Sequence, residues 1–203
     1  VMVRKYTDKE LLNRVKELDS FKGYPRGRWI IGVRSSADLT NKFDDKFYIY
    51  EGTKFIDVMT GTTNAGVTIL KGGFKKFNSK GCAILKSDMW YHNVWKYGLH
   101  RGRMPSLKQL GSQVIIHRDN DMDGKAEELG RAYMGWFGIN FHSNTYDFSK
   151  KNIKIHREDI NSWSAGCQTI NQRVKYMDHM RWFKKALDSG TQKFVSYCLI
   201  KEF

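Results

Sequence analysis

The residues of this chain best suited to chemistry are one cysteine, Cys167, and one histidine, His142. A free thiol has a pKa of about 8.5, so a cysteine nucleophile needs a nearby base at neutral pH. Gly166, directly before the cysteine, permits the close backbone approach that an oxyanion hole requires. The pair predicts a nucleophile and its base, with the backbone N–H groups of Cys167 and Gly166 as oxyanion donors.

The histidine lies in a segment that alternates like a β-strand. Ile139 and Phe141 share one face, and Asn140 and His142 share the other. An alternative interpretation is a buried thiol and a hydrogen-bonded core imidazole, which is the more common arrangement of such residues. The spacing alone does not decide between the two.

A short motif around these residues resembles the catalytic motif of the L,D-transpeptidase family. The family motif is a His-(Gly/Ser) element followed by Ser-x-Gly-Cys. Here His142-Ser143 precedes Ser164-x-Gly166-Cys167. The resemblance implies a β-rich domain that cleaves or rejoins peptidoglycan stem peptides through a cysteine thioester.

The likeness covers residues 137–170 and is closest to a divergent branch found in phage and bacterial cell-wall proteins. Gln168 and Thr169 replace the branched apolar residue and the Arg or Asn that usually follow the cysteine. The interval between His142 and Cys167 is longer than is usual in the family. This length predicts an extra loop between the two halves of the site.

The resemblance also implies roles for the neighbouring residues. Cys167 is the expected nucleophile and His142 the base that activates it. Ser164 is expected to brace the loop, and Ser143 or a backbone carbonyl to hold the imidazole tautomer. The residues expected to contact the substrate are Asn140, His100, Trp163 and Gln168.

One acidic segment copies the first half of an EF-hand loop. Asp119, Asp121 and Asp123 supply oxygen ligands at positions one, three and five, and Gly124 stands at position six. Position twelve is Gly130, where an EF-hand has a bidentate Glu. A solvated turn is therefore the expected state and calcium the alternative, and no other metal or cofactor is expected.

Composition restricts the partners. The chain has 35 Lys and Arg against 21 Asp and Glu, which gives a net charge of +14. Such an excess favours a polyanion: nucleic acid, an anionic membrane surface, or an anionic cell wall. Residues 90–97 mix basic and aromatic side chains that suit either stacked bases or the wall of a peptide or glycan cleft. Charge alone does not select one partner.

Cysteine usage and hydropathy bear on location. Cys82 and Cys198 lie in apolar runs and are expected to be buried, and the count of three with no CxxC pattern indicates synthesis in a reducing compartment. Neither a signal peptide nor a transmembrane segment is expected. The expectation is cytoplasmic synthesis followed by action at the cell wall or periplasm, after release by a holin, carriage in a virion, or processing that left Val1 first.

The elements that must position the site are mostly strands. A capping box at residues 7–10 predicts a helix over 8–19, and a second helix is expected over 172–188. Short apolar runs separated by glycine turns predict an α+β, mainly β, sandwich or barrel with flanking N-terminal and C-terminal helices. The expected strands are 29–33, 46–50, 54–59, 67–70, 82–85, 113–117, 137–143 and 193–200, with 89–95 open between strand and loop.

The sequence therefore predicts a single L,D-transpeptidase-like domain over 1–203, in which 1–25 is an N-terminal helical appendage. Its expected activity is cysteine-dependent acyl transfer or hydrolysis at L,D-peptide bonds of peptidoglycan stem peptides, in a lytic hydrolase of the phage type. Two rivals stay open: a basic nucleic-acid-binding protein with structural Cys167 and His142, although nucleic acid is not the expected partner, and a non-catalytic wall-binding domain.

Overall fold

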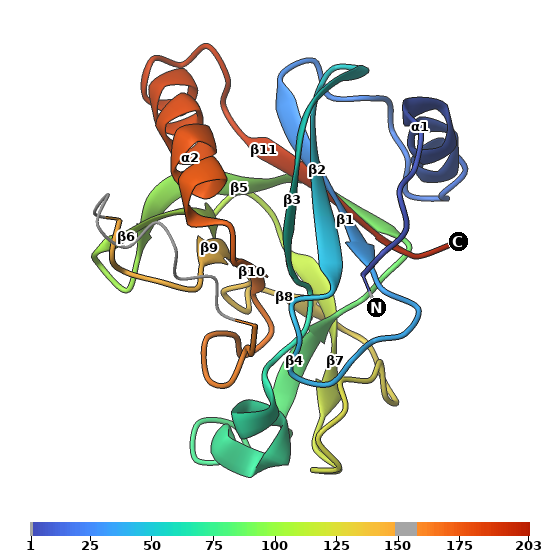
Figure 1. Cartoon of the computed structure of the whole chain (residues 1–203), viewed down its shortest axis with the longest axis vertical. Helices are drawn as coiled ribbons and strands as arrows, with labels where there is room; N and C mark the ends of the chain where they lie inside the picture. The colour runs from blue at the N-terminus through green and yellow to red at the C-terminus, as the bar shows by residue number, and fades with distance from the viewer. Residues whose placement is uncertain (1, 149–157) are drawn as a thin grey trace.

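A closed barrel forms the body of the chain. The computed structural model describes residues 2–148 and 158–203, and its barrel order is β1-β11-β5-β6-β9-β10-β3-β2 (Figure 1). Most neighbouring strands are antiparallel, while β1 with β11 and β9 with β10 are parallel. The bounds are β1 Arg28–Arg34, β2 Asp45–Glu51, β3 Lys54–Thr62, β5 Met89–His100, β6 Met104–Gln109, β9 Phe141–Ser143, β10 Gln168–Ile170 and β11 Val195–Lys201.

A smaller antiparallel sheet lies beside the barrel. It has the order β4-β7-β8, with β4 Cys82–Leu85, β7 Val114–Asp119 and β8 Tyr133–Gly135. Figure 1 shows β4 and β7 extending toward the bottom of the view. The predicted mainly β chain is confirmed.

Two helices flank the barrel, as predicted. The first, α1 (Asp8–Lys16), starts with the predicted capping box, in which Thr7 and Glu10 bind each other's backbone N–H groups. The second, α2 (Arg173–Asp188), packs against β5 and β6 and buries an apolar stripe that includes Tyr176, Met180 and Phe183. Among residues 2–148 and 158–203, no helix is long and apolar enough to cross a lipid bilayer.

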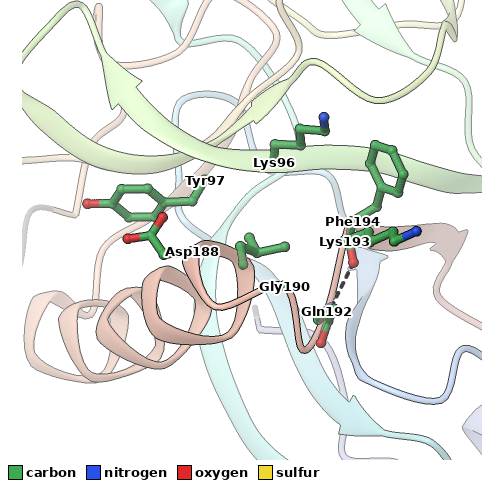
Figure 2. A pocket seen from close by; sticks show the side chains of 8 residues that line it. Lys96, Tyr97, Asp188, Gly190, Gln192, Lys193 and Phe194 are labelled. Carbon is green, nitrogen blue, oxygen red and sulfur yellow. Dashed lines mark hydrogen bonds between the residues drawn. The ribbon is translucent and has the colours of Figure 1, made fainter.

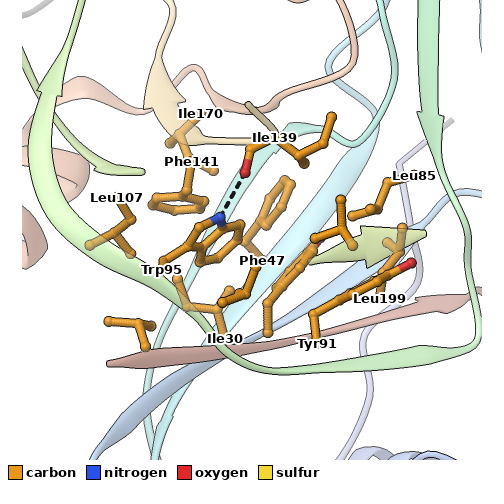
Figure 3. Packing of buried hydrophobic residues seen from close by; sticks show 14 of the residues in the cluster. Ile30, Phe47, Leu85, Tyr91, Trp95, Leu107, Ile139, Phe141, Ile170 and Leu199 are labelled. Carbon is orange, nitrogen blue, oxygen red and sulfur yellow. Dashed lines mark hydrogen bonds between the residues drawn. The ribbon is translucent and has the colours of Figure 1, made fainter. Parts of the chain in front are cut away.

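Aromatic side chains fill the barrel interior (Figure 3). Trp95 stacks on Tyr197 with 4.7 Å between ring centroids, and its indole N–H donates to the Ile139 carbonyl at 2.8 Å. Phe141 lies in the same cluster. Gly32 makes room for this packing, because a Cβ there would lie 1.9 Å from the Tyr197 hydroxyl oxygen. The packing of β9 is thus tied to residues far away in the sequence.

Several strand predictions need correction. The strand expected over 67–70 is wrong, because residues 69–73 form the helical turn η1 (Ile69–Gly73), where Gly72 has a φ of 102°. Residues 89–95, for which the sequence allows a strand or a loop, belong to the long strand β5. The expected strand over 137–143 pairs only from Phe141 onward. Part of the extra loop expected between His142 and Cys167 lies outside the described residues.

Phe141 should contribute strongly to stability, since it anchors β9 in the core. Phe141→Ala should lower the free energy of unfolding by about 3–5 kcal/mol, because it leaves a cavity among buried aromatic rings. Denaturant titration followed by circular dichroism measures this loss. Phe77→Ala is the matched control, since Phe77 is 71% exposed and its loss should cost less than about 0.5 kcal/mol. Equal losses would contradict the packing described.

Candidate active site

The register of two short strands brings the candidate catalytic residues together. In the parallel pair, Gln168 lies opposite Phe141 and Thr169 lies opposite His142. Successive strand residues point to opposite faces, so Phe141 and Gln168 point into the barrel while His142 and Thr169 point outward. Cys167 directly precedes β10, next to the buried Gln168.

The sulfur of Cys167 is held by backbone groups of the segment that leads into β9. Its Sγ accepts a hydrogen bond from the Asn140 N–H and donates one to the Gly138 carbonyl, both at 3.4 Å. Part of the residue is accessible to solvent. Burial of the sulfur raises the pKa of the thiol to about 11, although the Asn140 N–H and the Arg101 charge act in the opposite direction. The thiol is therefore protonated at neutral pH.

His142 is buried and held in one tautomer. Its Nδ1 lies 2.7 Å from the Ser143 carbonyl oxygen, which can only accept, so Nδ1 carries the proton and Nε2 the lone pair. Burial, and then the neighbouring His100 ring, lower the pKa of His142 to about 3. The imidazole is neutral at physiological pH. Of the two tautomer holders expected, the backbone carbonyl of Ser143 is the one in place.

A second imidazole covers the first. The His100 ring, at the end of β5, stacks on His142 with 4.2 Å between centroids. Burial, Arg101 and Lys108 lower the pKa of His100 to about 4. The Asn140 side-chain amide lies 3.3 Å from His100 Nδ1. Two neutral rings thus stack at the site. Asn140 contacts His100 through its side chain and the Cys167 sulfur through its backbone N–H.

Gln109 organises this segment, and sequence analysis missed it. Its Oε1 accepts the N–H groups of Phe137 and Ile139 at 3.1 and 3.0 Å, and its Nε2 donates to the Gly135 carbonyl at 3.0 Å. Its own backbone N–H donates to Asn140 Oδ1 at 2.9 Å. One buried side chain therefore sets the path of the backbone that holds the Cys167 sulfur. No motif or spacing marks Gln109 in the sequence.

Two hydrogen bonds of the Ser164 hydroxyl brace the loop before the cysteine. The Ser164 hydroxyl donates to the Cys167 carbonyl at 2.8 Å and accepts the Gly166 N–H at 3.2 Å. The Gly166 N–H is therefore engaged, and the prediction that it lines an oxyanion hole needs correction. Within residues 2–148 and 158–203, the Cys167 N–H has no hydrogen-bond acceptor, so it remains the candidate oxyanion donor.

Gly166 is required for a different reason than the one expected. Its φ of 120° is strained for any residue with a side chain, and a Cβ there would lie 2.2 Å from the Ala83 carbonyl oxygen. The close approach is thus to strand β4. Gly166 lets the nucleophile loop lie directly on the smaller sheet.

The sulfur and the imidazole are close in the fold but are not bonded to each other. In the described part of the chain, no hydrogen bond joins Cys167 Sγ to His142. The Nε2 atom instead lies 3.4 Å from Thr169 Oγ1. Thr169 is a second site residue that sequence analysis did not assign. Its hydroxyl is placed to donate to the lone pair that a general base would use.

A polar cavity adjoins the histidine pair. It measures about 210 Å³ and is lined by His100, Arg101, Met104, His142, Tyr146, Ser162 and Trp163. Trp163, expected to contact substrate, packs beside Tyr146 with 5.6 Å between ring centroids. Arg101 brings a positive charge close enough to lower the pKa of both Cys167 and His142. The cavity suits a ligand that carries a carboxylate.

Gln168 does not line this cavity, contrary to the prediction that it contacts substrate. Its side chain is fully buried, and its Oε1 accepts the Tyr197 hydroxyl at 2.6 Å inside the barrel. The alternation of β10 sends its side chain to the face opposite His142. Gln168 is therefore part of the barrel core.

A larger cavity of about 310 Å³ lies elsewhere, between β5 and the end of α2 (Figure 2). Lys96, Tyr97 and Asp188 are among its lining residues. None of the residues lining it is a cysteine or a histidine. The smaller cavity is the one that contains His142 and His100, while Cys167 lies outside its lining.

The three thiols should differ sharply in reactivity. Iodoacetamide should modify Cys167 alone, because Cys82 and Cys198 are only 1% and 0% exposed. Its rate should rise about tenfold per pH unit from about pH 7 to about pH 10, since only the thiolate reacts and the pKa is about 11. Peptide mass spectrometry measures site and rate. Earlier modification of Cys82, or a plateau near pH 8, would contradict the surroundings described for the sulfur.

Comparisons of the chain with protein-family models, with curated proteins and with solved structures found no match. The features of the chain that bear on its function are the site geometry and the motif around Cys167.

Proposed function

We propose that this chain is a cysteine acyl-transfer enzyme that acts on L,D-peptide bonds of peptidoglycan stem peptides. The observation that carries the proposal is the shared outer face of β9 and β10. On it, a partly exposed thiol lies near a neutral imidazole whose proton is fixed on Nδ1. The motif resemblance supplies the substrate class and the L,D-transpeptidase-like fold.

The pKa values exclude a preformed thiolate–imidazolium pair in the free protein, so the proposed mechanism needs proton transfer during the attack. A thiol pKa of about 11 and an imidazole pKa of about 3 keep the proton on the sulfur in the free protein. His142 Nε2 would take that proton as Sγ attacks the carbonyl carbon of the scissile bond. The developing oxyanion would meet the Cys167 N–H.

Collapse of the tetrahedral intermediate completes the first half of the reaction. The C–N bond breaks, the imidazolium returns its proton to the leaving amine, and a thioester on Cys167 remains. Water then releases the acyl group as an acid, or an amine takes it up as a new amide. We favour water, as expected for a lytic hydrolase of the phage type.

Substrate binding must break the hydrogen bonds that hold the Cys167 sulfur and His142 Nε2 in the free protein. The sulfur must leave the Gly138 carbonyl and the Asn140 N–H, and Nε2 must leave the Thr169 hydroxyl. Catalytic hydrogen bonds are often long or misaligned before substrate binds, so the free geometry is compatible with this role. A peptide that displaces water from the cavity would strengthen the contact between thiol and base.

The charges around the cavity support an acidic peptide substrate. Stem peptides carry free carboxylates, and Arg101 lies in the cavity wall beside His142. Trp163 and Tyr146 offer aromatic faces to the rest of the chain or to sugar rings. The net charge of +14 favours binding to an anionic cell wall, which we propose as the site of action, reached after cytoplasmic synthesis.

Purified sacculi provide the direct test. The wild-type protein should release new muropeptides, identified by mass spectrometry, and Cys167→Ala should reduce their rate of formation about 10³-fold or more. The matched control is Cys198→Ala, which removes a fully buried thiol in β11 and should keep activity wherever the protein stays folded. His142→Gln should lose about 10²–10⁴-fold, because it removes the base.

An unchanged muropeptide profile with folded wild-type protein would contradict the proposal. Sacculus binding without new products would instead identify a wall-binding domain. Salt-sensitive binding to DNA that survives alkylation of Cys167 would favour the nucleic-acid alternative.

A further inference from the structure

The outer face of β5 connects the polar cavity beside His142 with the larger cavity near the end of α2. The strand places His100 in the wall of the first cavity and Lys96 in the wall of the second. These two residues are four positions apart with Gly98 between them, so all three share one face of the strand. At a rise of about 3.3 Å per residue, this face is about 13 Å long.

A second lysine lies on this face, on the neighbouring strand β6. Lys108 is paired directly opposite Lys96 in the antiparallel ladder of β5 and β6. A Cβ at Gly98 would lie 2.7 Å from Lys108 Cδ, so the lysine side chain crosses the glycine toward His100. Arg101 follows His100 and lines the smaller cavity. Lys96, Lys108 and Arg101 together are called the basic strip.

The positive charges of the basic strip are not compensated. Within residues 2–148 and 158–203, no ion pair joins any of its three residues to a carboxylate. Like charges directly opposite each other on neighbouring strands destabilise a sheet, so the pairing of Lys96 with Lys108 is unfavourable in the free protein. An anion bound over the strip removes this repulsion.

The strip also acts on the candidate active site. Burial lowers the pKa of His100, and the charges of Arg101 and Lys108 lower it further. The His100 ring stacks on His142, the proposed base. A ligand that follows the strip therefore reaches the residues proposed to carry out the reaction.

The larger cavity extends the strip at its other end. Lys193 lines it together with Lys96, and both lysines are exposed. Figure 2 shows Lys96 beside Phe194, and the Lys96 Nζ lies 4.8 Å from the centroid of that ring. Asp188, the one acidic residue among the described residues that line the cavity, is already paired with Lys184. This cavity therefore favours an anionic ligand with some apolar surface.

The dimensions and charges together fit an extended acidic peptide. An extended chain advances about 3.3–3.6 Å per residue, so four residues span the distance from His100 to Lys96. A lysine ammonium is a compact point charge with three donors on a flexible stem, which suits carboxylates whose positions vary along a peptide.

We propose that the basic strip binds the carboxylates of the peptidoglycan stem peptide and that the larger cavity receives the end of this peptide remote from Cys167. This inference rests on the proposed function and deepens it, because it assigns Lys96 and Lys108 as residues that determine substrate specificity. Both lie away from the reacting bond, so they stabilise the bound substrate and the transition state alike. Their loss should raise KM and leave kcat nearly unchanged.

Binding of a purified tetrapeptide muropeptide to Cys167→Ala protein, measured by calorimetric titration, tests the inference without turnover. Adding Lys96→Gln/Lys108→Gln should weaken the Kd about 5–10-fold, because two charged contacts are lost. The difference should shrink as NaCl is raised from about 50 mM to about 500 mM, since salt screens exposed charges. The Tm should stay equal or rise, because the repulsion between the two lysines is removed.

Lys75→Gln/Lys76→Gln is the matched control, because it removes the same charge from two exposed lysines outside the strip and should leave the Kd unchanged. Equal Kd values for the strip variant and the control would overturn the inference, as would absence of muropeptide binding by the folded Cys167→Ala protein. Loss of DNA affinity in the strip variant with unchanged muropeptide binding would also overturn it. Failure of the proposed function is read separately, as the absence of new muropeptides when the wild-type protein acts on sacculi.

Discussion

The parallel ladder between β9 and β10 is the interaction on which the candidate site depends. Its register directs the side chains of Phe141 and Gln168 into the barrel and those of His142 and Thr169 to the opposite face. A slip of one residue would exchange the two sets and bury the chemistry. The aromatic packing around Phe141 and the bond from Tyr197 to Gln168 hold this register from inside. Core packing and site geometry are therefore one constraint.

The second constraint is electrostatic. Burial keeps both candidate reactants neutral, since it raises the pKa of Cys167 and lowers that of His142. A histidine whose folded pKa is about 3 resists protonation, so the native state loses stability as pH falls below its unfolded pKa of about 6.5. His100 acts in the same direction, while Asp45, whose pKa is raised to about 7 mainly by burial, acts in the opposite one as pH rises.

Local pattern was sufficient for part of the fold and of the site. The capping box and the opposite faces of Phe141 and His142 follow from short stretches of sequence. What could not be predicted depends on register between distant segments. Gln109 and Thr169 reach the site through pairings that no spacing encodes, and Gln168 was misassigned because its face was unknown. Gly166 was recognised as necessary, but its partner, Ala83, lies on another sheet.

The most direct measurement of the central claim is detection of the acyl intermediate on Cys167. Protein mixed with a tetrapeptide muropeptide, quenched in acid and digested, should yield the peptide containing Cys167 with the mass of the acyl group added. Hydroxylamine should remove that mass, as expected for a thioester. Turnover of the substrate with no adduct at any time, or turnover that persists after Cys167 is alkylated, would contradict the account.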